Sequence, residues 1–383
     1  MHDLTRSTRD RNKLKIFTLI LKHGEISRSE LSRISELTRP TVSAVMRDLV
    51  AMGWVRKVGK GKSSGGKRPM MYEICPDALY VIGFDVADEF LIRGVLCDFS
   101  GNIKAESEYE YENDFDSILQ LLAKMTTELA GDIPHDKIQG IGIAVAGIVD
   151  SKLNEVTDCY HLNLASRGMA DKLSGMTGLP VVLENRPNAA VLAEHQISGE
   201  DMVYLTCGRG VGAGIISEGK LFRGSFGAAG EMGRILLPGR ANDVIGVDTT
   251  STLESQTRLS KVLAEVRSMK RTDIQYDDVI QMYLDSDSEV TKIMNRNAEY
   301  LAYGAFIVAN IVNPEVIVIG GKVCELGDNY INHLIESFRQ FPCNRHQQRT
   351  RIRFASLGKF QPALGGAVMI LQNTIAEMAV ETA

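Results

Sequence analysis

Apolar residues near the N-terminus recur at helical spacing in three successive segments. The first is Asn12–His23, where leucine, isoleucine and phenylalanine fall on one face. A capping-box pattern at Ser27–Glu30 opens a short second segment, because a serine followed three residues later by a glutamate satisfies the first N–H groups of a helix. The third begins near Thr38, has Pro40 in its first turn and ends at Gly53. The pattern therefore predicts three short helices.

Alternation replaces helical spacing after the third helix. Trp54–Val58 and Met70–Ile74 are expected to be strands, and Gly59–Pro69 between them is a loop rich in glycine, serine and lysine. Three helices and a basic hairpin predict a winged helix-turn-helix over residues 1–75, whose last helix enters the major groove of DNA. The candidate DNA contacts are Arg39, Thr41, Ser43, Arg47, Lys60, Lys62, Lys67 and Arg68. The alternative is a small helical module whose basic loop is only a solvated tether.

Residues 78–383 carry buried strands that alternate with helices. Short apolar runs at Tyr80–Val86 and Ile138–Val145 predict strands, and Met202–Thr206 opens a second set of them. Helical spacing at Phe115–Ala130 predicts a helix between the first strands. Such alternation is typical of an α/β fold. Because the strands fall into two successive groups, we expect a second domain over residues 78–383 that consists of two lobes.

Charge is distributed unevenly between the two regions. Through Cys75 the chain has 16 Lys and Arg against 7 Asp and Glu, a local charge of +9, whereas the remainder has 27 against 41, or −14. A basic head on an acidic body predicts double-stranded DNA as a partner, with salt-dependent binding. No segment reaches the about 18 apolar residues of a membrane span. With no signal-peptide pattern and six scattered cysteines, a cytoplasmic protein is expected.

Several glycine-rich and polar segments occur in a fixed order along the chain. They are Gly65–Pro69 in the wing, then Gly140–Asp150, Pro180–Asn185 with Asn188–Ala190, Gly208–Gly214, Gly230–Gly233 and Asn313–Gly321. Together they resemble the motifs of the ROK family, which is named for repressors, open reading frames and sugar kinases. The resemblance covers essentially the whole chain. It implies a two-lobed, actin-like (ribonuclease H-like) sugar-kinase fold behind the winged helix-turn-helix, and a homodimer or higher homo-oligomer.

Three positions depart from the pattern of the family's kinases. Arg186 stands where the resemblance places the general base, an aspartate, and an arginine cannot accept a proton at neutral pH. The first phosphate loop is Asp85–Glu89, where side chains replace glycines and two added carboxylates would repel a triphosphate. Arg234 replaces the histidine of the family's zinc motif, and Ile235–Leu253 contains neither cysteine nor histidine. We therefore expect no catalytic residue, no cofactor and no structural metal.

The resemblance also implies an effector site between the lobes. Asn185, Glu231 and Glu254 match the family's sugar contacts, where amide and carboxylate groups hold hydroxyls. Arg186 and Arg234 would lie near them, so one hypothesis is an anionic effector, such as a sugar phosphate or a sugar acid. A second is that each arginine pairs with Glu231 or Glu254. A third is that both glutamates are ordinary surface or helix-cap carboxylates.

These inferences favour a regulator over an enzyme. The expected function is a DNA-binding transcription regulator, a repressor of carbohydrate uptake or catabolism genes, under the control of a small sugar-type effector. The alternative is an active ROK sugar kinase with an accessory DNA-binding head, against which Arg186 argues. A third class is a constitutive DNA-binding protein whose body serves only for dimerisation.

Overall fold

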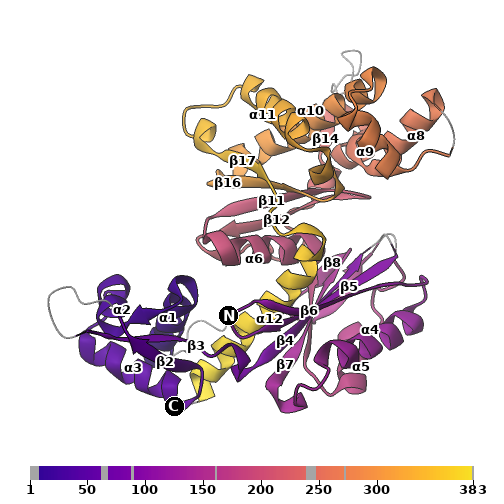
Figure 1. Ribbon diagram of the computed structural model, residues 1–383. Helices are drawn as coiled ribbons and strands as arrows, with labels where there is room; N and C mark the ends of the chain where they lie inside the picture. The colour runs from indigo at the N-terminus through magenta and orange to yellow at the C-terminus, as the bar shows by residue number, and fades with distance from the viewer. Residues whose placement is uncertain are drawn as a thin grey trace.

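The chain folds into a head and two lobes (Figure 1). The computed structural model describes residues 8–61, 68–87, 90–159, 162–238, 247–270 and 273–381. Within these ranges, no helix combines the length and the apolar character that crossing a membrane requires.

The head contains three helices and a three-stranded sheet. Its elements are α1 (Thr8–His23), β1 (Ile26–Ser27), α2 (Arg28–Ser35), α3 (Arg39–Ala51), β2 (Val55–Lys60) and β3 (Met70–Ile74). The hydroxyls of Ser27 and Thr38 accept hydrogen bonds from the N–H groups of Glu30 and Thr41, so both residues cap the helices that the sequence predicts. The strands lie in the order β1-β3-β2. The predicted winged helix-turn-helix is confirmed.

The first lobe is built on a five-stranded sheet. Its elements are β4 (Tyr80–Ala87), β5 (Leu91–Asp98), β6 (Ile103–Glu110), α4 (Phe115–Ala130), β7 (Ile138–Val145), β8 (Ile148–Asp150), β9 (Glu155–Asp158), α5 (Met169–Thr177) and β10 (Val181–Asn185). The sheet order is β10-β7-β4-β5-β6, with antiparallel pairing from β4 to β6 and parallel pairing from β4 through β7 to β10. Both faces of β4 and β7 are covered, which explains their nearly continuous apolar sequences.

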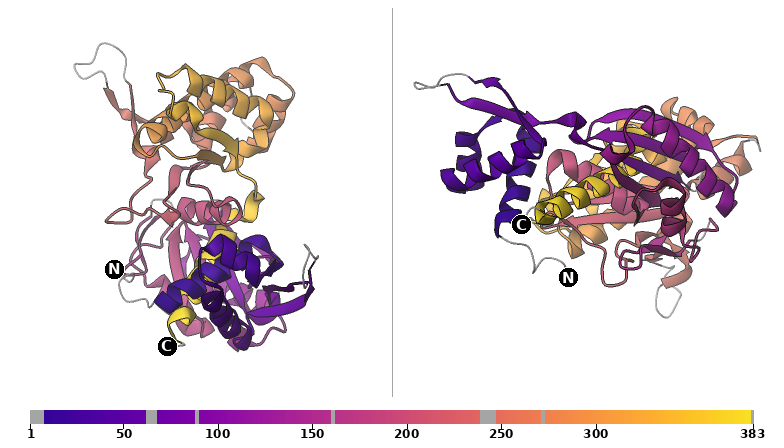
Figure 2. Two further views of the ribbon diagram at one scale, coloured as in Figure 1. Left: turned by 90° about the vertical axis from the view of Figure 1, so that its left-hand side faces the viewer. Right: turned by 90° about the horizontal axis from the view of Figure 1, so that it is seen from below.

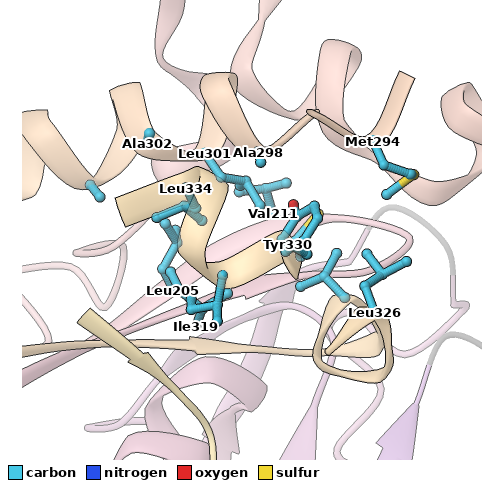
Figure 3. Close-up of a cluster of buried hydrophobic side chains, with 14 of the residues drawn as sticks. Leu205, Val211, Met294, Ala298, Leu301, Ala302, Ile319, Leu326, Tyr330 and Leu334 are labelled. Atoms are coloured by element: carbon cyan, nitrogen blue, oxygen red, sulfur yellow. The ribbon is translucent and has the colours of Figure 1, made fainter. Parts of the chain in front are cut away.

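The second lobe repeats this arrangement. Its strands are β11 (Met202–Cys207), β12 (Val211–Ser217), β13 (Lys220–Leu221), β14 (Leu236–Pro238), β15 (Val247–Thr252), β16 (Val316–Gly320) and β17 (Arg351–Phe354). Its helices are α7 (Leu253–Thr257), α8 (Leu259–Met269), α9 (Tyr276–Leu284), α10 (Ser288–Ile311) and α11 (Asp328–Gln340). The order β13-β12-β11-β16-β17 is the same antiparallel-then-parallel sequence as in the first lobe. Leu205, Ile319, Leu301, Tyr330 and Leu334 pack together between this sheet and α10 and α11 (Figure 3).

Two helices cross where the lobes meet. α6 (Arg186–Ser198) lies beneath the second sheet, and α12 (Gln361–Glu381) runs diagonally from that point along the first lobe to the head (Figure 1). The crossing depends on glycine. A Cβ at Gly83 would lie 1.9 Å from the carbonyl oxygen of Ala363, and one at Gly365 would lie 1.7 Å from that of Ala189. Only residues without a side chain allow this approach, so the helices and the first sheet are held backbone to backbone.

A shared hydrophobic core joins the head to the first lobe. Phe99 directly follows β5. The centre of its ring lies 4.8 Å from the ring centre of Phe17 and 5.2 Å from that of Trp54, and both of these residues belong to the head. Ile370 and Ile375 of α12 belong to the same cluster. The C-terminal half of α12 lies beside the head in both directions of view (Figure 2). The head is therefore a continuation of the first lobe and not a module on a free tether.

We expect Phe99→Ala to release the head from the body. Removal of a buried aromatic ring costs about 3–5 kcal/mol of unfolding free energy, and here the ring is shared by two units. The chain has one tryptophan, Trp54, so its fluorescence during urea unfolding reports on this contact. Phe226→Ala is the matched control, because that ring is 88% exposed and its loss should change stability by less than about 0.5 kcal/mol. Unchanged Trp54 emission and unfolding in Phe99→Ala would contradict the shared core.

Candidate functional site

The exposed face of α3 carries most of the predicted base contacts. Arg39, Ser43 and Arg47 are four residues apart and so line one stripe of the helix, with both arginines exposed and Ser43 half-buried. The opposite face of α3 is buried in the core of the head. Thr41 differs, because its hydroxyl lies 2.8 Å from that of Thr38 and its N–H is bound by the same cap. The structure thus brings Arg39, Ser43 and Arg47 together on one stripe, whereas Thr41 takes part in the cap at the start of α3.

The strands β2 and β3 form the stem of the wing, which extends away from the body (Figure 2). Lys60 and Arg68 are exposed where the described part of the wing ends. Arg56 is paired with Glu73 across the two strands, with 2.6 Å between Nη2 and Oε1, so it braces the stem. Lys62 and Lys67, which are also predicted DNA contacts, lie outside the described residues.

Arg186 and Asp85 form a two-point ion pair at the centre of the body. Arg186 is the first residue of α6, and its Nε and Nη2 lie 2.8 and 3.1 Å from Oδ1 and Oδ2 of Asp85. The Asp85 side chain, at the end of β4, is completely buried, and Nη1 of Arg93 lies 4.0 Å from its Oδ2. A buried carboxylate requires such a partner. The residue at the expected position of the general base therefore neutralises the aspartate of the first phosphate loop, a partner that the sequence-based hypotheses did not include.

Glu184 forms a second buried ion pair, and this one joins the lobes. Its Oε2 lies 2.7 Å from Nε of Arg223, which follows β13 of the second lobe. Its Oε1 accepts hydrogen bonds from the N–H of Asn185 and the side-chain amide of Asn188. The Asn185 side chain donates to the carbonyl of Gly147 at 2.6 Å. Asn185 is thus fixed at the start of α6.

The remaining predicted effector residues gather on the second lobe. Nε of Arg234 lies 3.4 Å from Oε2 of Glu231, and its Nη2 lies 3.9 Å from Oδ2 of Asp158 in the first lobe. Oε2 of Glu254 accepts the N–H of Val211 at 2.9 Å, so it caps the second glycine-rich loop. Burial raises the pKa of Glu231, and the nearby charges of Glu254 and Asp158 add to the rise while Arg234 opposes it. The site is an acidic cluster with one arginine at its edge.

The glycines of the second loop serve close packing. A Cβ at Gly210 would lie 3.0 Å from Oε2 of Glu254, and one at Gly214 would lie 2.2 Å from the carbonyl oxygen of Pro187. The contact with backbone at Gly214 requires glycine whether or not a phosphate approaches the loop. This glycine is therefore not by itself evidence for a nucleotide.

The two loops that would hold phosphates in a kinase contact each other through side chains. The guanidinium of Arg209, in the second loop, lies 5.5 Å from the centre of the Phe90 ring, at the start of β5. Phe90 has a φ of 60° and packs edge-on against Tyr111. Of the first loop, Asp88 and Glu89 lie outside the described residues. The Arg209 contact and the Glu184 ion pair both tie one lobe to the other.

Sequence reasoning missed the partners Arg93, Arg209 and Arg223. One signal was available, since Asp85 and Glu184 end buried strands and each buried carboxylate needs a cation. The sequence does not say which arginine supplies it. In the part of the chain that the structure describes, no three or more His, Cys, Asp and Glu residues are arranged to hold a metal ion.

Profiles of two known families match the chain. The profile of the ROK family matches residues 89–373, and a winged helix-turn-helix DNA-binding profile matches residues 9–56. The chain belongs to the ROK family. Over 95% of its length it is 28% identical to the xylose repressor of Caldicellulosiruptor bescii, of which the match covers 96%. A ROK family transcriptional regulator, a homologue of the E. coli MLC protein, superposes with a TM-score of 0.80 at 21% identity, covering 97% of this chain and 98% of that one.

An enzyme of the same family shares the body. The ROK family glucokinase from Streptomyces griseus, in complex with glucose and AMPPNP, superposes with a TM-score of 0.68 at 22% identity. It covers 76% of this chain and 99% of the glucokinase. These superpositions confirm the two-lobed, actin-like sugar-kinase fold.

We expect Arg186→Gln to destabilise the body and Asp85→Asn to rescue it. Removing the arginine takes away the two-point partner of a completely buried carboxylate, a loss of about 3–5 kcal/mol. The double variant removes both charges, so its unfolding free energy in urea should lie closer to that of the wild type. Lys124→Gln, which breaks an exposed pair with Glu128, is the control and should cost at most about 1 kcal/mol. Additive losses in the double variant would show that the pair contributes no coupling.

Proposed function

We propose that this protein is a transcription regulator that represses genes for carbohydrate uptake or catabolism and responds to a sugar-type effector. The observation that carries the proposal is the stripe of Arg39, Ser43 and Arg47, exposed on the recognition helix of a winged head. A relative that matches over nearly its whole length is named a xylose repressor. We divide the chain by role into a DNA-binding head of residues 1–75 and an effector-binding, dimerising body of residues 78–383, although their cores are continuous.

The residue at the expected position of the general base argues against the kinase alternative. Transfer of phosphate to a sugar requires a base for the hydroxyl, and Arg186 stands at that position with its charge held by Asp85. The contact between Arg209 and Phe90 lies where phosphates would enter. A coupled assay for ADP release with a panel of sugars tests this alternative, and steady turnover above the rate without protein would favour it.

The charges around the effector site favour a neutral sugar. Glu231 and Glu254 offer charged acceptors to hydroxyl groups, and Asn185 adds an amide. Of the two arginines, Arg186 is already engaged by Asp85, and Arg234 lies among carboxylates. An anionic effector, such as a sugar phosphate or sugar acid, would have to compete with these carboxylates. A thermal-shift panel of neutral sugars, sugar acids and sugar phosphates separates the two versions.

The effector would act through the relative position of the lobes. A ligand shifts an equilibrium only when it binds two states unequally, and residues from both lobes surround this site. Since the head is part of the first lobe, a change between lobes would move the two heads of a dimer relative to each other. That alters their fit to paired half-sites on DNA. A constitutive regulator, the third class, would bind its operator with the same affinity in every sugar.

We expect Arg39→Gln and Arg47→Gln each to weaken operator binding by about 10- to 100-fold, because a direct base or phosphate contact contributes about 1–3 kcal/mol. The measurement is fluorescence anisotropy with duplex DNA from upstream of the protein's own gene, repeated at several salt concentrations. Arg258→Gln is the control, since this exposed arginine lies in the second lobe. Wild-type protein that shows no salt-sensitive binding of this duplex would overturn the proposed function.

We expect sugar affinity to fall as the pH is lowered from about 7.5 to about 5. Burial raises the pKa of Glu231, so its carboxylate is protonated at a higher pH than usual and then loses its strength as a charged acceptor. The unliganded protein should gain stability over the same range, because an acid with a raised pKa in the folded state binds its proton more tightly there.

Calorimetric titration with the stabilising sugar at several pH values measures this effect. Glu231→Gln should weaken binding about tenfold at neutral pH and flatten the profile. Glu336→Gln, an exposed glutamate on α11, is the control and should keep the wild-type profile. An unchanged profile in Glu231→Gln would remove Glu231 from the site.

A further inference from the structure

A cavity of about 570 Å³ lies in the second lobe, away from the effector site. It is lined by the C-terminal half of α11, the segment that follows it and the first residues of β17, and it is open to solvent on one side. Ligands of α/β sheets bind at the carboxyl ends of the strands, but this cavity adjoins Thr350–Ile352 at the amino end of β17. Its size falls within the range that small ligands occupy. It therefore does not belong to the site between the lobes.

The cavity is cationic although the body is acidic. Arg339, Arg349 and Arg351 line it, and no carboxylate does. In the described part of the chain, Arg339 and Arg349 form no ion pair, while Arg351 is paired with Glu200. About one residue in eight of the whole chain is Asp or Glu, yet none occurs between Ser337 and Ala376. This local exclusion of negative charge is what an anion-binding surface requires.

Apolar side chains line the same cavity as the arginines. Ile335 and Phe338 of α11 and Ile352 of β17 line the same cavity, and Phe338 is nearly completely buried. A concave surface that combines arginines with apolar side chains differs from the flat, lysine-rich surfaces that follow a DNA backbone. The arginine forks can each hold a phosphate or carboxylate at two points.

We propose that this cavity binds a small anionic metabolite, one with a phosphate or carboxylate group beside an apolar portion. The site is connected to the effector site by α6. The helix α6 starts with Arg186. Glu194 within α6 binds Arg353 at 2.8 Å, and Glu200, just after the end of α6, pairs with Arg351. An anion on Arg351 competes with Glu200 and so loosens one end of the helix whose other end holds the effector residues.

The test is calorimetric titration of the full-length protein with inorganic phosphate and with phenyl phosphate at constant ionic strength. Phenyl phosphate should bind more tightly, because its ring contacts the apolar side chains of the cavity. Arg339→Gln and Arg349→Gln should each weaken it about tenfold or more. Arg345→Gln is the matched control, since this exposed arginine of the same segment does not line the cavity. Circular dichroism melts verify that the exposed substitutions leave the fold intact.

Five results would overturn the proposal. The first four are no detectable binding of either probe, an equal loss in Arg345→Gln, a loss in Arg234→Gln in place of the cavity variants, and a change of oligomeric state in the cavity variants by sedimentation. The third result would assign the anion to the effector site, and the fourth would make this face a contact between copies of the chain. The cavity variants should also keep wild-type affinity for operator DNA. The fifth result is loss of that affinity, which would assign these arginines to the DNA surface. Failure of the DNA-binding proposal is a separate outcome, because it is measured by the operator affinity of the α3 variants.

Discussion

The structure depends on one close crossing of backbones. At Gly83 and Gly365 a side chain would collide with carbonyl oxygens of α12 and α6, and a Cβ at Gly142 would lie 2.0 Å from the carbonyl oxygen of Gly366. Because no side chain intervenes, α12 is fixed against the first sheet and against α6 at the same place. α6 packs on the second sheet, and α12 continues to the head. One contact thus sets the position of all three parts, and any movement between lobes must take place about it.

The positions that depart from the resemblance to the family's kinases hold structural contacts. Arg186, where that resemblance places the base, pairs with the buried Asp85, and in the proposed regulator this position has no group that could accept the sugar proton. Arg209 and Arg223 then join the lobes through Phe90 and Glu184. A kinase needs lobes that can separate to admit a nucleotide. A sensor needs two arrangements of its lobes, to which the effector binds with unequal affinity. Contacts of modest strength between the lobes fit the second requirement.

The sequence predicted most elements because their signals are local. Capping at Ser27 and Thr38, the alternation of β2 and β3, and the buried runs of β4 and β7 follow from spacing alone, and the family motifs supplied the order of the lobes. The start of α6 at Arg186 and the partners of the buried carboxylates could not be found this way. Those partners are distant in the chain, 101 residues in the case of Arg186 and Asp85. Which arginine reaches which carboxylate is decided by tertiary packing.

The shared core of head and first lobe limits how a signal can reach DNA. If the head were tethered, closure of the lobes would leave its orientation free and change little at the operator. With Phe99 packed between Phe17 and Trp54, the head moves only with the first lobe. The part whose position can change relative to the head is then the second lobe, which carries Glu231 and Glu254. Ion pairs and the helix crossing join it to the first lobe. In the proposed mechanism, an effector that bridges the lobes would change the angle between them. In a dimer joined through its second lobes, that angle would set the distance between the recognition helices.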